Sequence, residues 1–411
     1  MRYGLLGEKL GHSFSKEIHE KLGLYSYELI ELTPAGLDAF LREKDFSGVN
    51  VTIPYKQTVI PYLDGISDRA GRIGAVNTIV NRGGKLFGDN TDFGGLEALV
   101  RRTGLVLEGK TVLIAGTGGT SRTARAVAEA MGAAKVLRMS RSGKEDAISY
   151  EEAYEKYASA QILFNTTPSG MYPKPDGMAV DPDRLPELEG VIDVVYNPLT
   201  TRLVREARER GIRAENGLYM LVAQAVLAAE TFTGMQFGQD VTDGIFAGLV
   251  FEKRNIVLTG MPSSGKSTIG RILSEKLGRE LVDTDEEIVK RAGMPITEIF
   301  RTKGEKTFRD LETETIQEVS ASGGKVLSTG GGAVLRKRNV DLLKSNGTVV
   351  FLDRPLEALL PSDDRPLADD AEKLRRLYTE RLPVYTASAD VILQVGGTPE
   401  QTTEKLLEKL K

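Results

Sequence analysis

The sequence predicts an α/β protein made of three α/β domains. Short apolar runs alternate with segments of helical periodicity along the chain, which is typical of this class. Two of these runs lead directly into glycine-rich loops, at residues 116–119 and 260–265, and a helical pattern follows each loop. The chain has 411 residues, more than one hydrophobic core usually organises, so two or three domains are expected.

The composition narrows the possible classes of protein. The formal net charge of −4 gives no indication of binding to nucleic acid or to a membrane surface. There is no cysteine, which excludes disulfides and thiolate chemistry, and the two histidines, His12 and His19, lie near the N-terminus. The most apolar stretch, 218–229, is about twelve residues long and predicts a buried helix instead of a membrane span. The first residues lack the apolar core of a signal peptide, and a cytoplasmic location is expected.

The first domain is expected to comprise residues 1–100 together with a helical segment, 218–252. On fold analogy, helical patterns at 217–231 and 243–251 should pack back on this block. The strand-like runs are at 3–6, 27–32 and 48–53, followed by a hairpin pattern in which 75–81 and 85–88 flank the Gly83-Gly84 turn.

A second pattern begins with residues 111–115, TVLIA, a continuous apolar run expected of a strand covered on both faces. The run leads into Gly116, Gly118 and Gly119, and a helix is expected to open at about Ser121. Glycines in such a turn let the backbone approach a pyrophosphate, and the N–H groups of the helix N-terminus face it. Residues 101–217 are therefore predicted to form a Rossmann-type dinucleotide domain, with further strands at 136–139, 162–165 and 191–195.

The end of the second strand of this domain indicates which dinucleotide binds. NAD enzymes usually carry an acidic residue there, which binds the ribose 2′-hydroxyl. Here the chain has Ser140, Arg141 and Ser142, so the first charge met is basic. An arginine flanked by hydroxyls suits the 2′-phosphate of NADP(H), which is the predicted cofactor.

Four polar segments stand out in the first domain: 12–15 (HSFS), 50–56 (NVTIPYK), 74–78 (GAVNT) and 88–92 (GDNTD). Together with 165–171, 193–198 and 217–225, they resemble the shikimate dehydrogenase family in order and spacing over roughly residues 1–250. The resemblance implies that Lys56 and Asp92 form the catalytic pair. Hydride delivery to a ketone leaves an alkoxide that needs a proton, and an ammonium group held by a carboxylate can supply it.

The same resemblance implies the binding residues of the first site. Ser13 and Ser15 would bind the substrate carboxylate, and Gly217 and Met220 would lie on the nicotinamide side. The ring hydroxyls or the carboxylate would be bound by Thr52, Asn77, Tyr196 and Gln224.

The last part of the chain, residues 253–411, is predicted to be a P-loop domain with a parallel sheet. The segment from Gly260 to Ser267 fits G-x-x-x-x-G-K-[ST], follows the apolar run 255–259 and precedes a helical pattern at 267–277. In such a loop the backbone N–H groups hold the phosphates of ATP, Lys266 meets the β and γ oxygens, and Ser267 binds Mg²⁺. Ser264, Gly265 and Thr268 belong to the same predicted nucleotide site.

The next strand, 280–282, ends at Asp283 and Asp285, beside the nucleotide in a sheet of this kind. An arginine-bearing helical pattern, a glycine triplet and a later Arg-Leu-Pro segment follow. Together with the P-loop and the two aspartates, these features resemble the shikimate kinase family over roughly residues 254–411. The resemblance implies that Asp283 binds Mg²⁺ and that Asp285 orients or deprotonates the 3-hydroxyl. It further implies a substrate carboxylate held by Arg309 and Arg381, a ring lying against Gly330, Gly331 and Gly332, a lid residue Arg365 on the phosphoryl group, and Pro399 against adenine. The family's adenine-stacking arginine is missing, because Leu-Leu-Pro-Ser occupies 359–362.

Both resemblances lead to one expectation: a fusion that reduces 3-dehydroshikimate with NADPH and then phosphorylates shikimate with ATP. One alternative is a quinate/shikimate dehydrogenase fused to another small-molecule P-loop kinase, although Arg309 and Arg381 argue for an anionic substrate. Another is that one half is a non-catalytic regulatory module, although the charged residues predicted to act in catalysis and binding are present in both sites. A homo-oligomer is left open.

Overall fold

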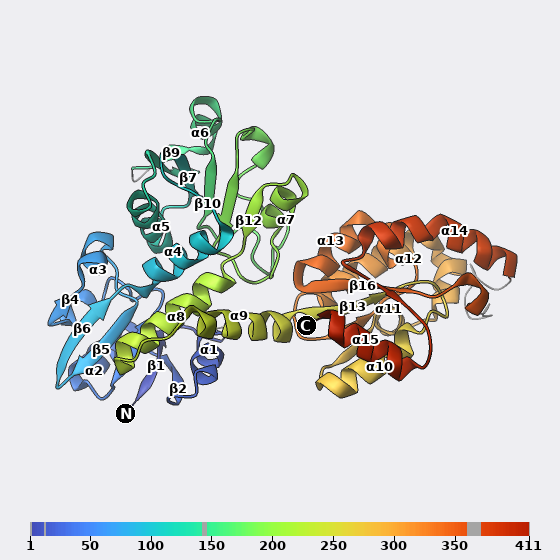
Figure 1. Ribbon diagram of the computed structural model, residues 1–411, viewed down its shortest axis with the longest axis horizontal. Coiled ribbons are helices and arrows are strands. Elements are labelled where there is room, and N and C mark those ends of the chain that lie inside the picture. The colour runs from blue at the N-terminus through green and yellow to red at the C-terminus, as the bar shows by residue number, and fades with distance from the viewer. Residues whose placement is uncertain (1, 12–13, 142–145, 360–370, 411) are drawn as a thin grey trace. The chain divides into compact units, whose positions relative to one another are not determined.

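The computed structural model describes residues 2–11, 14–141, 146–359 and 371–410 (Figure 1). The chain divides into two compact units. The first consists of Met1–Asn197 and Thr201–Ala247, and the second of Pro198–Thr200 and Gly248–Lys411. Ser13, Ser142 and Arg365 lie outside the described residues.

The first unit begins with a mixed six-stranded sheet in the order β2-β1-β3-β5-β6-β4. Strand β1 pairs in parallel with β2 and β3, and β5 returns antiparallel to β3 with Asn50 opposite Thr78. Its buried side chains, such as Leu6, Val49 and Ile79, form a core with helix α2. The elements are β1 (Tyr3–Gly7), α1 (Ser15–Lys21), β2 (Tyr27–Glu31), α2 (Pro34–Glu43), β3 (Gly48–Val51), β4 (Gly65–Ile66), α3 (Asp68–Ile73), β5 (Thr78–Arg82) and β6 (Lys85–Asp89).

The second sheet of this unit is fully parallel, in the order β12-β11-β10-β7-β8-β9. The chain leaves the central strand β7 toward β8 and later returns to its other side at β10. Ligands of open α/β sheets bind at such a switch point, outside the carboxyl ends of the strands. The elements are β7 (Thr111–Ala115), α5 (Gly119–Ala130), β8 (Lys135–Ser140), β9 (Ile148–Ser149), α6 (Tyr150–Lys156), β10 (Ile162–Asn165), β11 (Gly190–Asp193), α7 (Arg202–Glu209) and β12 (Arg213–Glu215).

Helices α4 (Thr91–Thr103) and α8 (Leu218–Thr233) pack against each other within the first unit (Figure 1). The Asn90 side chain starts α4 by accepting the N–H of Phe93, and Gly104 ends it in the left-handed conformation at φ 68°. The helices approach closely at Gly95, where an added Cβ would lie 2.7 Å from the carbonyl oxygen of Met220. A further helix, α9 (Gln239–Lys253), contains the boundary between the two units.

The second unit contains a five-stranded parallel sheet in the order β14-β15-β13-β16-β17. Helix α10 starts directly after the loop that follows the central strand β13, and Gly265 caps it at φ 97°. Helix α12 is interrupted at Gly304, whose backbone is not helical. The elements are β13 (Asn255–Thr259), α10 (Lys266–Leu277), β14 (Leu281–Asp283), α11 (Thr284–Ala292), α12 (Ile296–Val319), β15 (Val326–Ser328), α13 (Lys337–Asn346), β16 (Gly347–Asp353), α14 (Ala371–Ser388), β17 (Val391–Gln394) and α15 (Pro399–Leu410).

The predicted fold class is confirmed, with small differences at element ends. The strand predicted at 48–53 ends at Val51, because the N–H of Tyr55 donates to the carbonyl of Thr52 and closes a turn. The strand predicted at 191–195 ends at Asp193, because the carboxylate of this residue accepts the N–H of Val195. The helix expected at about Ser121 begins at Gly119.

Candidate active sites

The predicted catalytic pair of the first site is in direct contact. Lys56 lies in the loop after β3, and Asp92 lies in the first turn of α4. The ammonium group of Lys56 donates to Asp92 Oδ2 at 2.6 Å, and the two side chains are 24% and 16% exposed. A lysine held in this way keeps its ammonium group at one place while remaining open to a ligand.

Two other predicted substrate residues, Asn77 and Gln224, lie beside the pair, and a third, Thr52, lies in the same loop as Lys56. Asn77 is buried and donates to Thr91 Oγ1 at 3.1 Å, and Thr91 directly precedes Asp92. The Asn77 amide also lies 3.5 Å from Gln224 Oε1, so α8 contributes to the same cluster. Thr52 follows β3, where its N–H donates to the carbonyl of Leu6. The structure therefore gathers Asn77 and Gln224 beside Lys56 and Asp92.

Tyr196 and Ser15 come from different parts of the first unit. The ring of Tyr196 lies 5.4 Å from that of Phe14, the residue that precedes Ser15 at the start of α1. Burial raises the pKa of Tyr196, so its hydroxyl keeps its proton at neutral pH. The Phe14 contact links the carboxyl edge of the dinucleotide sheet to α1, where the predicted carboxylate-binding serine lies.

The glycine-rich loop after β7 has the shape that a pyrophosphate needs. Gly116 has φ 110°, and an added Cβ would lie 2.7 Å from Thr166 Oγ1, so glycine is required there. Gly118 and Gly119 face open space, since an added Cβ meets nothing within 4 Å. The Ser121 hydroxyl donates to the Gly118 carbonyl at 2.7 Å and holds the loop against α5. The loop and the N-terminus of α5 fit a dinucleotide.

The residues after β8 offer groups for a phosphate. Arg141 is exposed, and Ser140 Oγ is buried without a hydrogen-bond partner among the described residues. At Gly217, which is predicted to lie beside the nicotinamide, an added Cβ would lie 2.1 Å from the carbonyl oxygen of Val194, so glycine is required. Met220 is nearly buried at the start of α8. These positions fit the phosphorylated ribose and the nicotinamide of NADP(H).

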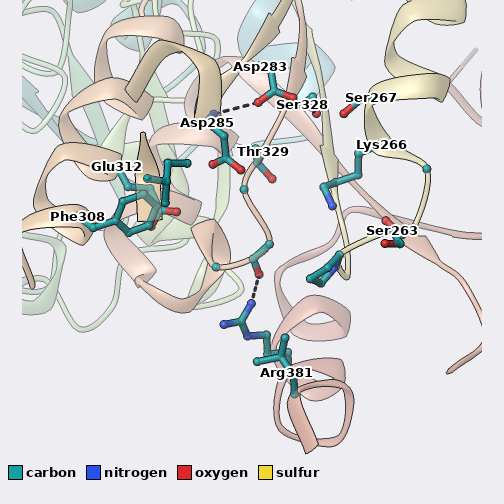
Figure 2. Close-up of a pocket in the computed structure, with 18 of the residues that line it drawn as sticks. Ser263, Lys266, Ser267, Asp283, Asp285, Phe308, Glu312, Ser328, Thr329 and Arg381 are labelled. Atoms are coloured by element: carbon teal, nitrogen blue, oxygen red, sulfur yellow. Dashed lines mark hydrogen bonds between the residues drawn. The ribbon is translucent and has the colours of Figure 1, made fainter. Parts of the chain in front are cut away.

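The second site is a cavity of about 470 Å³ that contains most of the residues predicted for it (Figure 2). Lys266 lines the cavity, and its ammonium group donates to the carbonyls of Gly260 and Met261 at 3.0 and 2.9 Å. The predicted residues that line it are Ser264, Gly265, Lys266, Ser267, Thr268, Asp283, Asp285, Arg309, Gly330, Gly331, Gly332 and Arg381. Pro399 starts α15 and is not part of this lining.

Two carboxylates enter the cavity from the end of β14. Asp283 caps α11 by accepting the N–H of Asp285 at 3.0 Å, and its other oxygen accepts the Ser328 hydroxyl at 3.0 Å (Figure 2). No group of three or more metal-ligating side chains is found among the described residues. Mg²⁺ at a nucleotide site takes one or two protein ligands and completes its shell with phosphate oxygens and water. Asp283 and Ser267 fit that requirement.

The arginines of the cavity are held in place by protein partners. Arg309 forms a buried ion pair with Glu312 at 3.0 Å, and burial raises the pKa of Glu312 despite the arginine beside it. An added Cβ at Gly332 would lie 2.2 Å from Arg309 Nη1, so this glycine makes room for the guanidinium. Arg381 donates to the Gly331 carbonyl at 2.8 Å.

The structure adds residues to the two sites that the sequence did not predict, among them Thr91, Glu312 and Arg354. Thr91 contacts Asn77 in the first site, and Glu312 and Arg354 line the cavity of the second. Glu312 could have been found, because it lies three residues after Arg309 on one helix face. Arg354 follows β16, whose carboxyl end meets the nucleotide edge of the sheet. The Asp-Arg-Pro sequence at the end of this apolar strand is a weak indication that an arginine lies beside the nucleotide.

The geometry defines a class: a metabolic enzyme that joins a dinucleotide-dependent oxidoreductase to a P-loop phosphotransferase. The family model described as the shikimate dehydrogenase substrate binding domain matches residues 5–79, and that described as shikimate kinase matches residues 262–411. The chain belongs to the shikimate dehydrogenase family in its first part and to the shikimate kinase family in its second.

Individual relatives cover each part almost completely. The NADP-dependent shikimate dehydrogenase of Clostridium perfringens (strain SM101 / Type A) is 36% identical over 265 residues, covering 59% of this chain and 96% of that protein. The shikimate kinase of Caldicellulosiruptor bescii is 45% identical over 161 residues, covering 38% of this chain and 94% of that protein. A crystal structure of Thermus thermophilus shikimate 5-dehydrogenase in complex with NADP(H) and shikimate superposes with a TM-score of 0.54 at 33% identity, covering 60% of this chain and 98% of that chain.

The predicted function class is confirmed: the chain is a bifunctional shikimate-pathway enzyme that uses NADP(H), and ATP with Mg²⁺. Among the described residues, no helix is long and apolar enough to cross a membrane.

Proposed function

We propose that the first site reduces the ketone of 3-dehydroshikimate and that the second transfers a phosphoryl group to the 3-hydroxyl of the resulting shikimate. The contact between Lys56 and Asp92 supports the first assignment. The shared cavity of the P-loop, Asp285 and Arg309 supports the second. The cytoplasmic location predicted from the sequence stays a prediction, and so does a homo-oligomer.

In the first site NADPH supplies the hydride, and the protein must neutralise the oxyanion that the ketone becomes. The Lys56 ammonium is the proton donor, and Asp92 holds it at the reacting oxygen. Asn77 and Gln224 orient the ring through its hydroxyls. Ser15 and Tyr196 are assigned to the carboxylate end. Ser13 has the same assignment by prediction alone.

In the second site ATP supplies the phosphoryl group, and catalysis consists mainly of positioning and charge stabilisation. Asp285 accepts the proton of the 3-hydroxyl, while Arg309 and Arg381 hold the carboxylate. Lys266 exchanges its two backbone carbonyl partners for phosphate oxygens. We assign Arg354 to the nucleotide, because it lines the same cavity and directly follows the carboxyl end of β16.

The test uses two pairs of substitutions in the full chain. Lys56→Met and Asp92→Asn should each lower the dehydrogenase kcat by a factor of about 100 or more and leave the kinase kcat unchanged. Lys266→Met and Asp285→Asn should do the reverse. The proposal is wrong if Lys56→Met keeps parental dehydrogenase activity, or if Asp285→Asn keeps parental kinase activity. Product identification by mass spectrometry, with 3-dehydroshikimate, NADPH and Mg·ATP supplied together, should give shikimate 3-phosphate.

A further inference from the structure

The Asn77 carboxamide, which the proposed function assigns to a ring hydroxyl of the substrate, can be rotated by 180° without changing its shape. The rotation exchanges an acceptor for a donor, so the surrounding hydrogen bonds must decide which end faces the ligand. The side chain is 2% exposed, and therefore water does not make this choice. The protein groups around Asn77 must fix its orientation.

The partners of Asn77 select one orientation. Asn77 Oδ1 accepts the backbone N–H of Thr91 at 2.7 Å, and this donor cannot reverse its role. The same oxygen accepts the Thr78 hydroxyl at 3.0 Å. The NH₂ group is then directed to Thr91 Oγ1 and to Gln224 Oε1, on the side of the predicted substrate residues. The longer of these two hydrogen bonds, at 3.5 Å to Gln224 Oε1, is the one that Asn77 can exchange for a hydrogen bond to the ligand.

The direction of the Thr78 hydroxyl is set in turn by two buried residues further from the pocket. Tyr27, on β2, donates to Asn50 Oδ1 at 2.7 Å. Asn50 must then present its NH₂ group on the other side, where Asn50 Nδ2 donates to Thr78 Oγ1 at 3.0 Å and to the Asn77 carbonyl at 3.3 Å. A hydroxyl that receives this hydrogen bond has its own proton free. Thr91 Oγ1, at 3.1 Å, can act as the donor in its contact with Thr78, which leaves the Thr78 proton for Asn77 Oδ1.

We propose that Tyr27, Asn50 and Thr78 form a directional chain of hydrogen bonds that holds Asn77 with its NH₂ group toward the substrate. All three are nearly inaccessible, at 1%, 4% and 0% exposed, so each bond is made in a medium where an unpaired group is costly. The three are positioning residues for the dehydrogenase reaction, since they act through Asn77 and do not reach the ligand themselves.

The strand register explains how the chain of bonds is built. Asn50 and Thr78 are direct partners across the β3–β5 pair, and Asn50 also faces β1, the neighbour of β2. The hydrogen bonds therefore cross the sheet from β2 to β5 and end at the start of α4. The structure assigns a function to polar residues that a purely apolar sheet core would not need.

The test compares substrate binding in Thr78→Val, Thr78→Ser and Tyr27→Phe, measured as shikimate oxidation with NADP⁺. Thr78→Val keeps the shape but removes the hydroxyl, so KM for shikimate should rise about tenfold while KM for NADP⁺ stays unchanged. Thr78→Ser restores the hydroxyl and should restore KM. Tyr27→Phe, a milder change at the far end, should raise KM for shikimate a few-fold. Thr103→Val, which removes a hydroxyl bonded to its own helix, is the matched control and should change neither KM.

Two further measurements separate failure of this proposal from failure of the proposed site. Asn77→Ala must raise KM for shikimate, and if it does not, the assignment of Asn77 to the substrate is wrong. A shikimate analogue that lacks the hydroxyl bound by Asn77 should bind Thr78→Val and the parent protein equally well. The directional chain is refuted if Asn77→Ala raises KM while Thr78→Val leaves it at the parental value, or if Thr78→Val raises both KM values alike.

Discussion

The buried carboxyl group of Asp193 predicts a pH dependence of the free energy of unfolding, whose magnitude follows from the pKa of this group. The carboxyl group is completely inaccessible at the end of β11, and burial raises its pKa to about 6 from the ordinary 3.8. Three hydrogen bonds oppose this effect: Asn165 Nδ2 at 2.9 Å and Val195 N at 3.1 Å donate to Oδ1, and the Thr201 hydroxyl donates to Oδ2 at 2.7 Å. The raised pKa shows that burial outweighs them.

The sign of the pH effect follows from proton linkage. The folded state binds this proton more tightly than the unfolded state, so ionisation of Asp193 costs no stability below about pH 4. The cost grows between pH 4 and pH 6 and is complete above pH 6. The gap between 3.8 and about 6 corresponds to about 3 kcal/mol of lost stability at neutral pH.

Asp193→Asn removes the titration but keeps the shape, because an amide oxygen can serve the two N–H donors and its NH₂ group can donate to Thr201. The free energy of unfolding of the variant, relative to the parent, should therefore increase by about 3 kcal/mol between pH 4 and pH 7. The assay is urea unfolding at several pH values, following the transition that NADP⁺ shifts, since that transition reports the first unit. A stability difference that is the same at pH 4 and pH 7 would refute the reasoning.

Three further predictions concern single side chains. Gly332→Ala should raise the kinase KM for shikimate about tenfold, because the added methyl group would displace the Arg309 guanidinium. Gly396→Ala, at an open position, is the control and should have no effect. A parental KM for shikimate in Gly332→Ala would contradict the packing argument. Arg354→Ala should raise the kinase KM for ATP about tenfold and leave the KM for shikimate unchanged. The control is Arg376→Ala, which removes an exposed ion pair and should change neither value. A parental KM for ATP in Arg354→Ala would exclude the nucleotide contact. Burial lowers the pKa of His19 to about 3, so the first unit should lose stability as the pH falls below 6.5. His19→Phe should reduce this loss, measured by thermal unfolding at several pH values. The same pH dependence in the variant and the parent would contradict the prediction.

The predictable part of this fold comes from strands that are covered on both faces. The runs 111–115, 162–165 and 255–259 were placed residue for residue, because continuous apolar sequence has few alternatives in a parallel sheet. Element ends were less predictable, because side chains such as that of Asp193 end a strand through hydrogen bonds that the pattern does not contain.

The candidate sites show the same division. The P-loop residues and the lysine–carboxylate pair have recognisable spacing, and the structure brings each set together. Arg354 was missed because its neighbours in space are distant in sequence. The role inferred for Asn50 was also out of reach, because it depends on the direction of hydrogen bonds across a sheet and not on which residues are present.

Helix α9 has a consequence for dividing this enzyme into its two activities. Near its start, Asp243 accepts the hydroxyl of Tyr219 at 2.8 Å, and near its end, the carbonyl of Phe251 accepts Arg279 at 2.6 Å. The first contact belongs to one unit and the second to the other. A cut before Asp243 would take the first contact from the first half, and a cut after Phe251 would take the second contact from the second half. A cut between these two residues keeps both contacts but leaves each half with only part of the helix. Separately produced halves should overlap, each carrying its own complete copy of α9, and their sum would be longer than the natural chain.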